Sequence, residues 1–184
     1  MKKSRILMTV GSLLLLGLFV FPLWNITLEA PQYPIPLGMD IHITKFTDTN
    51  LNNLKSSYTV AETRVRKLNS GNSERYFYQI EKPGKYGSST ASIEYSDLLE
   101  VIKALNSLKL EVDNDILKNP DYLENKFITE DGFQLGYYVS KGKATWYIKL
   151  EKYGSDKTLY IKDLEKIEAN FTEAKNKIEE LKNK

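Results

Sequence analysis

The longest apolar run of the chain stands near its start, from Ile6 to Trp24, and contains no charged residue. A membrane-spanning helix needs roughly 17 to 25 such residues, whereas the apolar part of a secretory signal has about 7 to 15. The pattern therefore predicts a transmembrane anchor over residues 6–24, marked along its length by Ile6, Leu14, Phe19 and Trp24. Residues 1–5 form a basic flank, so the positive-inside rule places them in the cytoplasm and the rest beyond the membrane. The alternative is that this segment is a signal that is cleaved and that the rest of the chain is secreted.

Residues 25–57 form a predicted spacer, rich in proline and asparagine. Its segment 31–38 holds three prolines and a final glycine, which favours an extended, polyproline-like conformation. Residues 39–45 alternate as a short strand, and residues 48–57 indicate a loop or a single helical turn. The remaining residues, 58–184, have the size of one ordinary domain.

Within this domain, period-2 alternation predicts two hairpins. The first joins residues 60–68 to 75–82 through Ser70-Gly71-Asn72, and the second joins residues 133–140 to 143–152 through Lys141-Gly142, after a turn at Asp131-Gly132. In the second hairpin the alternation places Trp146, Ile148 and Leu150 on one face.

Two stretches have helical periodicity. The first begins near a predicted N-cap at Ser96 and closes at Asn119-Pro120, and its apolar stripe comprises Leu98, Val101, Ile102, Leu105 and Leu108. The second begins at a predicted N-cap, Asp163, and its stripe comprises Leu164, Ile167, Phe171, Ala174, Ile178 and Leu181. Such stripes pack against the domain's own sheet or against a partner helix.

An approximate internal repeat links the two halves of the domain. FYQIEK at 77–82 recurs as YIKLEK at 147–152, and a Tyr-Gly-Ser turn, a short strand and an Asp-Leu helix start follow each copy. The sequence therefore predicts an α+β fold: an N-terminal transmembrane helix, then an antiparallel sheet with two packed helices, arranged as a duplicated hairpin-strand-helix unit or as two unrelated units of the same order.

Charge excludes one class of partner. Of the 26 Lys and Arg residues, Lys2, Lys3 and Arg5 precede the anchor, which leaves 23 against 24 Asp and Glu. The exported part is therefore near neutral, and nucleic-acid binding has no electrostatic support. With no cysteine, disulfides, thiol catalysis and cysteine metal sites are excluded.

The sequence contains no complete catalytic, cofactor-binding or metal-binding motif. His42 is the only histidine, so a histidine-dependent triad and a multi-histidine zinc site are excluded. Met39 and His42 could offer sulfur and nitrogen to copper, although positions three apart on a strand face opposite ways. Residues 113–115 lack the glycine and glutamate of a calcium loop and are interpreted as a polar turn. Glu81 and Glu151 occupy equivalent positions of the repeat. They could form a paired-carboxylate site, and the alternative is that each lies at a solvated strand end.

The aromatic content suggests a binding surface for a peptide, glycan or lipid. Tyrosines on or near strands are Tyr76, Tyr78, Tyr137, Tyr138, Tyr147 and Tyr160. The tentative surface comprises Tyr76, Tyr78, Tyr137 and Trp146. Tyrosine is also a common strand residue, so a purely structural role is the alternative.

Two parts of the chain resemble different families. PLWNITLEAPQYP at 22–34, followed by Leu-Gly-Met at 37–39, resembles small single-pass membrane proteins of unknown function from bacterial nitrous-oxide-reductase gene clusters, a likeness that covers residues 1–45. AETRVRKL at 61–68, STASIEYSDLLEVIKAL at 89–105 and WYIKLEKYGSDKTLYI at 146–161 are similar to an uncharacterised family of small exported flavobacterial proteins, over residues 58–181. Neither resemblance implies an activity.

Together these observations predict a non-enzymatic protein of the bacterial envelope. It is held in the inner membrane by a single span, and a periplasmic domain binds an envelope partner or acts structurally. One alternative is an accessory factor for a membrane-associated copper enzyme. Another is a secreted carrier of lipid or of a small apolar ligand, which requires a sizeable apolar cavity between sheet and helices.

Overall fold

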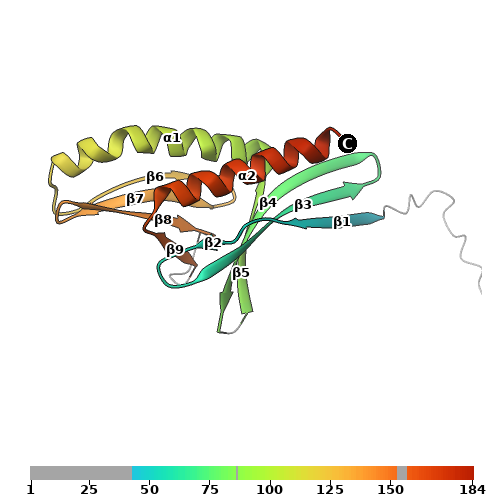
Figure 1. The fold of residues 1–184 in the computed structure, drawn as a ribbon, viewed down its shortest axis with the longest axis horizontal. Helices are drawn as coiled ribbons and strands as arrows, with labels where there is room; N and C mark the ends of the chain where they lie inside the picture. The colour runs from blue at the N-terminus through green and yellow to red at the C-terminus, as the bar shows by residue number, and fades with distance from the viewer. Residues whose placement is uncertain (1–42, 86, 153–156) are drawn as a thin grey trace, which may run out of the picture. The chain divides into compact units, whose positions relative to one another are not determined.

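A computed structural model describes residues 43–85, 87–152 and 157–184 of the chain (Figure 1). The predicted anchor and both copper-ligand candidates, Met39 and His42, lie outside these residues. Contacts separate the chain into residues 1–40 and 41–184, and the description below concerns the second unit alone. Among the helices of the described part, none has the length and apolar character needed to cross a membrane.

The described residues form two antiparallel sheets and two helices, which confirms the α+β class. Sheet 1 has the order β1-β3-β4-β5, with β2 also paired to β3, and comprises β1 (Thr44–Asn50), β2 (Leu54–Lys55), β3 (Val60–Ser70), β4 (Ser73–Gly84) and β5 (Gly87–Glu94). Sheet 2 has the order β6-β7-β8-β9 and comprises β6 (Leu123–Ile128), β7 (Gln134–Ser140), β8 (Lys143–Lys149) and β9 (Thr158–Ile161). The prediction of a single sheet was wrong, because a long helix separates β5 from β6 along the chain and the strands pair only within their own half.

Three of the predicted turns are confirmed, whereas Tyr86 of the first Tyr-Gly-Ser turn and residues 153–155 of the second lie outside the described residues. Gly71 has a φ of 56° between β3 and β4, Gly132 has a φ of 89° between β6 and β7, and Lys141 and Gly142 have φ values of 52° and 70° between β7 and β8. Two positive φ values in a two-residue loop match the twist of the flanking strands, so they fix the register of the second hairpin.

Three strands were not predicted in full: β1, β2, which lies within the predicted loop 48–57, and β6. β1 continues to Asn50, through residues expected to form a loop or helical turn, and β6 was not predicted at all. Because β1 and β2 both pair with β3, sheet 1 includes residues that the sequence assigned to the spacer. Both β1 and β6 lie at a sheet edge, where half-exposed polar residues replace the strong apolar alternation of a central strand.

The helices keep their predicted stripes. In α1 (Tyr95–Leu117) the buried apolar residues are Leu98, Val101, Leu105 and Leu108, and in α2 (Leu164–Lys182) they are Ile167, Phe171, Ala174 and Ile178. Asp163 caps α2 by accepting a hydrogen bond from the Glu165 amide, as predicted. The cap predicted at Ser96 was wrong. Glu94 occupies that position and makes no capping bond, since Arg75 binds both of its carboxylate oxygens.

α1 extends further than its stripe indicated. Residues 113–115 were interpreted as a polar turn, but they lie within the helix, which ends at Leu117 before Asn119 and Pro120. The reason is the environment of Asp115, which is buried and accepts hydrogen bonds from Tyr137 and Lys118. A buried carboxylate whose hydrogen bonds are satisfied in this way lowers the stability of the helix only slightly.

Each helix packs against the sheet of the other half (Figure 1). α1 follows sheet 1 in the chain but contacts β6, β7 and β8, in addition to β4 and β5. α2 follows sheet 2 but contacts β2 and β3 of sheet 1, together with α1. The helices run antiparallel, since Tyr95 at the start of α1 bonds Glu179 near the end of α2, and Lys109 binds Glu168. The two sheets therefore share one continuous core beneath the helices.

Candidate functional site

The four residues of the tentative binding surface all lie in the core. Tyr76, Tyr78, Tyr137 and Trp146 are exposed by 8 % or less. Tyr78 of β4 donates to the Asn170 side chain of α2, and Tyr137 of β7 donates to Asp115 of α1, 2.7 Å away. Burial, together with the Asp115 carboxylate, raises the pKa of Tyr137 to about 12. The hydroxyls of Tyr78 and Tyr137 therefore bind the helices that cover their sheets, and they are not available to a ligand.

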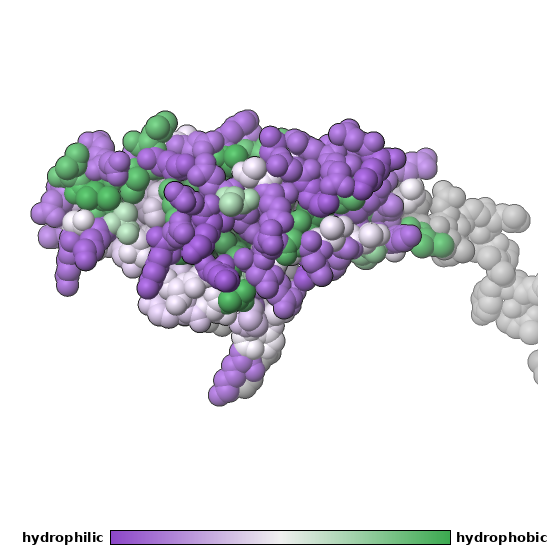
Figure 2. Space-filling model, in the orientation of Figure 1, coloured by the Kyte–Doolittle hydropathy of each residue, from purple (hydrophilic) through white to green (hydrophobic). Residues whose placement is uncertain are grey.

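The remaining strand tyrosines lie on the opposite face of sheet 2, away from the helices. Alternation places Tyr138 of β7, Tyr147 of β8 and Tyr160 of β9 on this outer face, and Tyr122 precedes β6 on the same side. Together with Glu124, Lys126, Gln134, Lys149 and Thr158 they line a hollow of about 280 Å³. We call this hollow the tyrosine hollow. Over the two helices, Figure 2 shows a mainly hydrophilic surface that hydrophobic patches interrupt.

Gly136 is a buried position of β7 on the face of sheet 2 that carries the tyrosine hollow. It stands opposite Lys126 on β6 and Tyr147 on β8, and a Cβ at this position would lie 2.4 Å from the Asn125 carbonyl oxygen. The Tyr147 hydroxyl donates to Glu124 of β6, two strands away, at 2.6 Å, so its ring must cross over the glycine between them. A side chain on Gly136 would block that crossing.

Two aromatic pairs stand at the margins of the hollow. Tyr122 stacks on Tyr138, with ring centroids 6.1 Å apart, and Tyr58 meets Tyr160 edge to face at 6.4 Å. Tyr58 belongs to the β2–β3 connection, which the bond from the Ser57 amide to the Tyr160 carbonyl holds against β9. Tyr58 and Tyr122 are 87 % and 62 % exposed, so both pairs have ring surface open to solvent.

The carboxylate of the tyrosine hollow is engaged, whereas several groups that can both donate and accept hydrogen bonds are free. Glu124 accepts from Tyr147 and from Lys126, the latter at 3.1 Å, and the Tyr147 bond in particular lowers the pKa of Glu124. Burial and the same carboxylate raise the pKa of Tyr147, which therefore stays protonated. Within the described residues, the hydroxyls of Tyr122, Tyr138 and Tyr160 and the Gln134 amide make no side-chain hydrogen bond.

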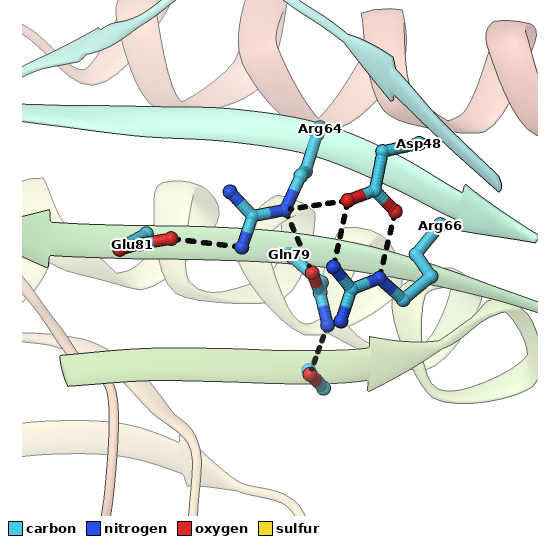
Figure 3. Close-up of polar contacts among 6 residues, drawn as sticks. Asp48, Arg64, Arg66, Gln79 and Glu81 are labelled. Atoms are coloured by element: carbon cyan, nitrogen blue, oxygen red, sulfur yellow. Dashed lines mark hydrogen bonds and ion pairs between the residues drawn. The ribbon is translucent and has the colours of Figure 1, made fainter. Parts of the chain in front are cut away.

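The outer face of sheet 1 carries a different arrangement, in which arginines and carboxylates satisfy one another (Figure 3). Arg66 binds both oxygens of Asp48 at 2.7 and 2.6 Å, and Arg64 binds Gln79 at 2.9 Å and Glu81 at 2.8 Å. The bond from Arg66 is the main reason why the pKa of Asp48 is lowered. Since carboxylates already pair with both arginines, this face has little uncompensated positive charge for an incoming anion.

The other candidates are not brought together. Glu81 pairs with Arg64 on sheet 1, whereas Glu151 pairs with Lys157 after β8. The described part of the chain contains no group of three or more histidine, aspartate and glutamate side chains placed to hold a metal ion. The signal that could have located the tyrosine hollow is Gly136 in the middle of a tyrosine-rich strand, because such a glycine indicates a close approach above it.

Comparisons with known proteins identified no related protein. The chain matches no family model, no curated protein and no solved structure.

Proposed function

We propose that this protein is a membrane-anchored binding protein of the bacterial envelope and that the tyrosine hollow is its ligand site. The observation that carries the proposal is the combination of exposed aromatic rings with hydroxyl and amide groups that make no side-chain hydrogen bond within the described residues, gathered around one hollow. Concave sites with a few converging polar groups are the usual form of a binding site. Tyrosine also provides a large contact area at a low cost in conformational entropy.

A binding role fits the described residues better than catalysis. General acid–base chemistry needs a group that is free to exchange a proton at the site. The only carboxylate that lines the hollow, Glu124, is engaged by Tyr147 and Lys126. The lipid-carrier alternative has less support, because large buried side chains such as Tyr78, Tyr137 and Phe171 fill the space between the sheets and the helices. The copper alternative depends on Met39 and His42, outside the described residues.

Position-specific cross-linking in intact cells tests the ligand site. A photoreactive phenylalanine analogue replaces Tyr138 in the full chain, and in a matched variant it replaces Phe46, which is 56 % exposed on the outer face of sheet 1. We expect a discrete adduct from position 138 and none from position 46. Equal labelling at both positions, or none at 138, would refute the tyrosine hollow as the ligand site.

The anchor is tested separately by fractionation. A C-terminally tagged full chain is compared with a version that lacks residues 1–30. A full-length, carbonate-resistant band that external protease cleaves after the outer membrane is opened is the expected result. A shortened soluble band would mean that the domain is secreted, and it would remove the anchor from the proposal.

We also propose that the two halves arose by duplication of a meander-helix unit. Each half has three consecutive antiparallel strands followed by a helix, β3-β4-β5-α1 and β7-β8-β9-α2, with two further strands before the first unit and one before the second. The repeated sequence in β4 and at the end of β8 supports the same idea. In homologous sequences the two halves should resemble each other at these positions, and the absence of that likeness would leave only a shared architecture.

A further inference from the structure

We infer that β5 is a pairing edge, to which a second copy of this chain adds its own β5 so that two copies of sheet 1 join into one continuous sheet. This inference concerns sheet 1 and goes beyond the proposed function, because it does not involve the tyrosine hollow. Three features of β5 support it: an open hydrogen-bonding edge, the lack of charges that protect such edges, and a sequence that is complementary to itself.

The outer edge of β5 is open. β5 is the last strand of sheet 1 and pairs with β4 alone. Among the described residues, no backbone hydrogen bond outside that ladder involves residues 87–93. An added Cβ on Gly87 would meet no atom within 4 Å beyond the neighbouring residues, and the end of the β4–β5 hairpin projects beyond the rest of the described domain (Figure 1). The N–H and C=O groups along this edge are therefore accessible to another strand.

The other edge strands have features that normally prevent such pairing. β1 contains Lys45 and β6 contains Lys126. β9 is four residues long, and its Tyr160 carbonyl accepts from the Ser57 amide of the β2–β3 connection. Charged side chains, short strands and covering loops are the usual means by which proteins keep edge strands from associating. By contrast, residues 87–93 of β5, GSSTASI, contain no charge and no proline.

The sequence of β5 is complementary to itself in an antiparallel pairing. Directly opposite residues of two antiparallel strands point to the same face, so the two-fold axis of such a dimer passes through one residue, and Thr90 is the centre of residues 87–93. On the outer face, Ser88, Thr90 and Ser92 read the same in both directions. Thr90 therefore meets its own copy, and each Ser88 meets Ser92 of the other chain. Hydroxyl pairs of this kind stabilise neighbouring strands.

The inner face of β5 fits the same register. Ile93, which is 3 % exposed, stands opposite Gly87 of the second copy, and Ala91 stands opposite Ser89. Each larger side chain thus meets a smaller one, and pairing adds no bulk beside the covered Ile93. Because a shift by one residue would exchange the two faces, the next possible axis is at Ala91. That register would place Glu94, which already binds Arg75, opposite Ser88.

Disulfide cross-linking tests the pairing and its register, because the chain has no cysteine of its own. Single-cysteine variants of the full chain are purified in detergent micelles and treated with a mild oxidant. Thr90→Cys places a thiol opposite its copy, at a Cα separation of about 4.5–5.5 Å, which a disulfide can span. We expect Thr90→Cys to form a covalent dimer, and Ser88→Cys to cross-link with Ser92→Cys rather than with itself. Thr172→Cys, exposed on α2, is the control and should stay monomeric.

Charged variants at the two-fold axis provide a second measurement. Thr90→Lys brings two ammonium groups together, so we expect the Kd of the dimer, measured by sedimentation equilibrium in the same micelles, to rise about tenfold or more. Thr90→Glu should weaken the dimer in the same way. An equimolar mixture of the two variants should restore dimers, which a misfolded edge would not do. Thr172→Lys, the matched control on α2, should leave the Kd unchanged.

Three results would overturn the inference. Thr90→Cys that cross-links no better than Thr172→Cys would show that the two β5 strands do not meet. A dimer whose Kd is unchanged by Thr90→Lys would be held together by another surface. A chain that remains monomeric would exclude a second copy, and an internal disulfide between Thr90→Cys and Thr27→Cys in that monomer would identify the chain's own N-terminal segment as the occupant of the edge.

Discussion

At the scale of single residues, Gly136 is the position at which the outer face of sheet 2 tolerates least change. Its backbone has no positive φ, so the difficulty for a side chain is space alone: an added Cβ would lie 2.4 Å from the Asn125 carbonyl oxygen and 2.6 Å from the Lys126 Cβ. We expect Gly136→Ala to lower the free energy of unfolding by about 2–3 kcal/mol, as overpacking does elsewhere.

Gly142 provides a matched comparison for this prediction. Its φ is 70°, and an added Cβ would meet only the Asn119 side chain at 3.6 Å, so Gly142→Ala introduces backbone strain without a clash. That strain should cost about 1 kcal/mol. Urea denaturation followed by circular dichroism measures both variants. A smaller loss for Gly136→Ala than for Gly142→Ala would contradict the close approach of β6 at Gly136.

Asp115 makes stability depend on pH. The Lys118 ammonium and then the Tyr137 hydroxyl lower the pKa of Asp115 below its ordinary value of 3.8. A carboxyl group whose pKa is lower in the folded state stabilises the fold above its unfolded pKa, and this contribution is lost as the pH falls through the folded value. Asp115→Asn should therefore cost about 1–2 kcal/mol at pH 7, where charged hydrogen bonds contribute most, and progressively less below pH of about 4.

The control for Asp115 lies two residues earlier on the same helix. Asp113 is exposed, so Asp113→Asn should change stability by less than about 0.5 kcal/mol. Denaturation midpoints between pH 2 and pH 7 provide the comparison. If the difference between Asp115→Asn and the original chain stays constant over this range, the buried carboxylate is not the group that titrates.

At the scale of elements, the sequence predicts the type and position of most helices and strands. It predicts much less about which elements pack against one another. Apolar periodicity placed both stripes correctly, and cap and turn residues placed the Asp163 cap and three turns. It could not show which sheet each stripe covers, because a stripe records only that a face is buried. Alternation likewise separates Tyr137 from Tyr138 but does not tell which of them faces a helix, and for this reason the tentative surface fell on the buried set.

The contact of α2 with sheet 1 depends on one buried amide. The Asn170 side chain accepts from the Tyr78 hydroxyl and donates to the Asn52 carbonyl oxygen at 2.8 Å. Asn170→Ala removes the acceptor of the fully buried Tyr78 hydroxyl and leaves only the Thr63 side chain beside it, whereas the Asn52 carbonyl keeps its bond from Thr63. We expect a loss of about 2–3 kcal/mol. Asn176→Ala, on the exposed face of α2, should not lower stability, because alanine has a higher helix propensity than asparagine.

A double variant identifies the cause of the Asn170 effect. Tyr78→Phe removes the stranded hydroxyl, so Tyr78→Phe with Asn170→Ala should lose less than the sum of the two single changes. Denaturation of the four chains provides the coupling energy, which we expect to be about 1 kcal/mol or more. Strict additivity would mean that the two side chains do not interact in the folded protein.

At the scale of the whole described domain, the exchange of helices should make the two sheets unfold together. α1 belongs to the first half by sequence yet packs on sheet 2 as well as on β4 and β5, and α2 packs on sheet 1, so neither half retains its whole core when the other opens. Asn170→Ala acts on sheet 1 and Gly136→Ala acts on sheet 2. In native-state hydrogen exchange each substitution should therefore lower the protection of the central amides of β4 and of β7 by the same free energy. Independent halves would respond differently: Asn170→Ala would lower protection in β4 alone, Gly136→Ala in β7 alone, and the shared core would not act as one cooperative unit.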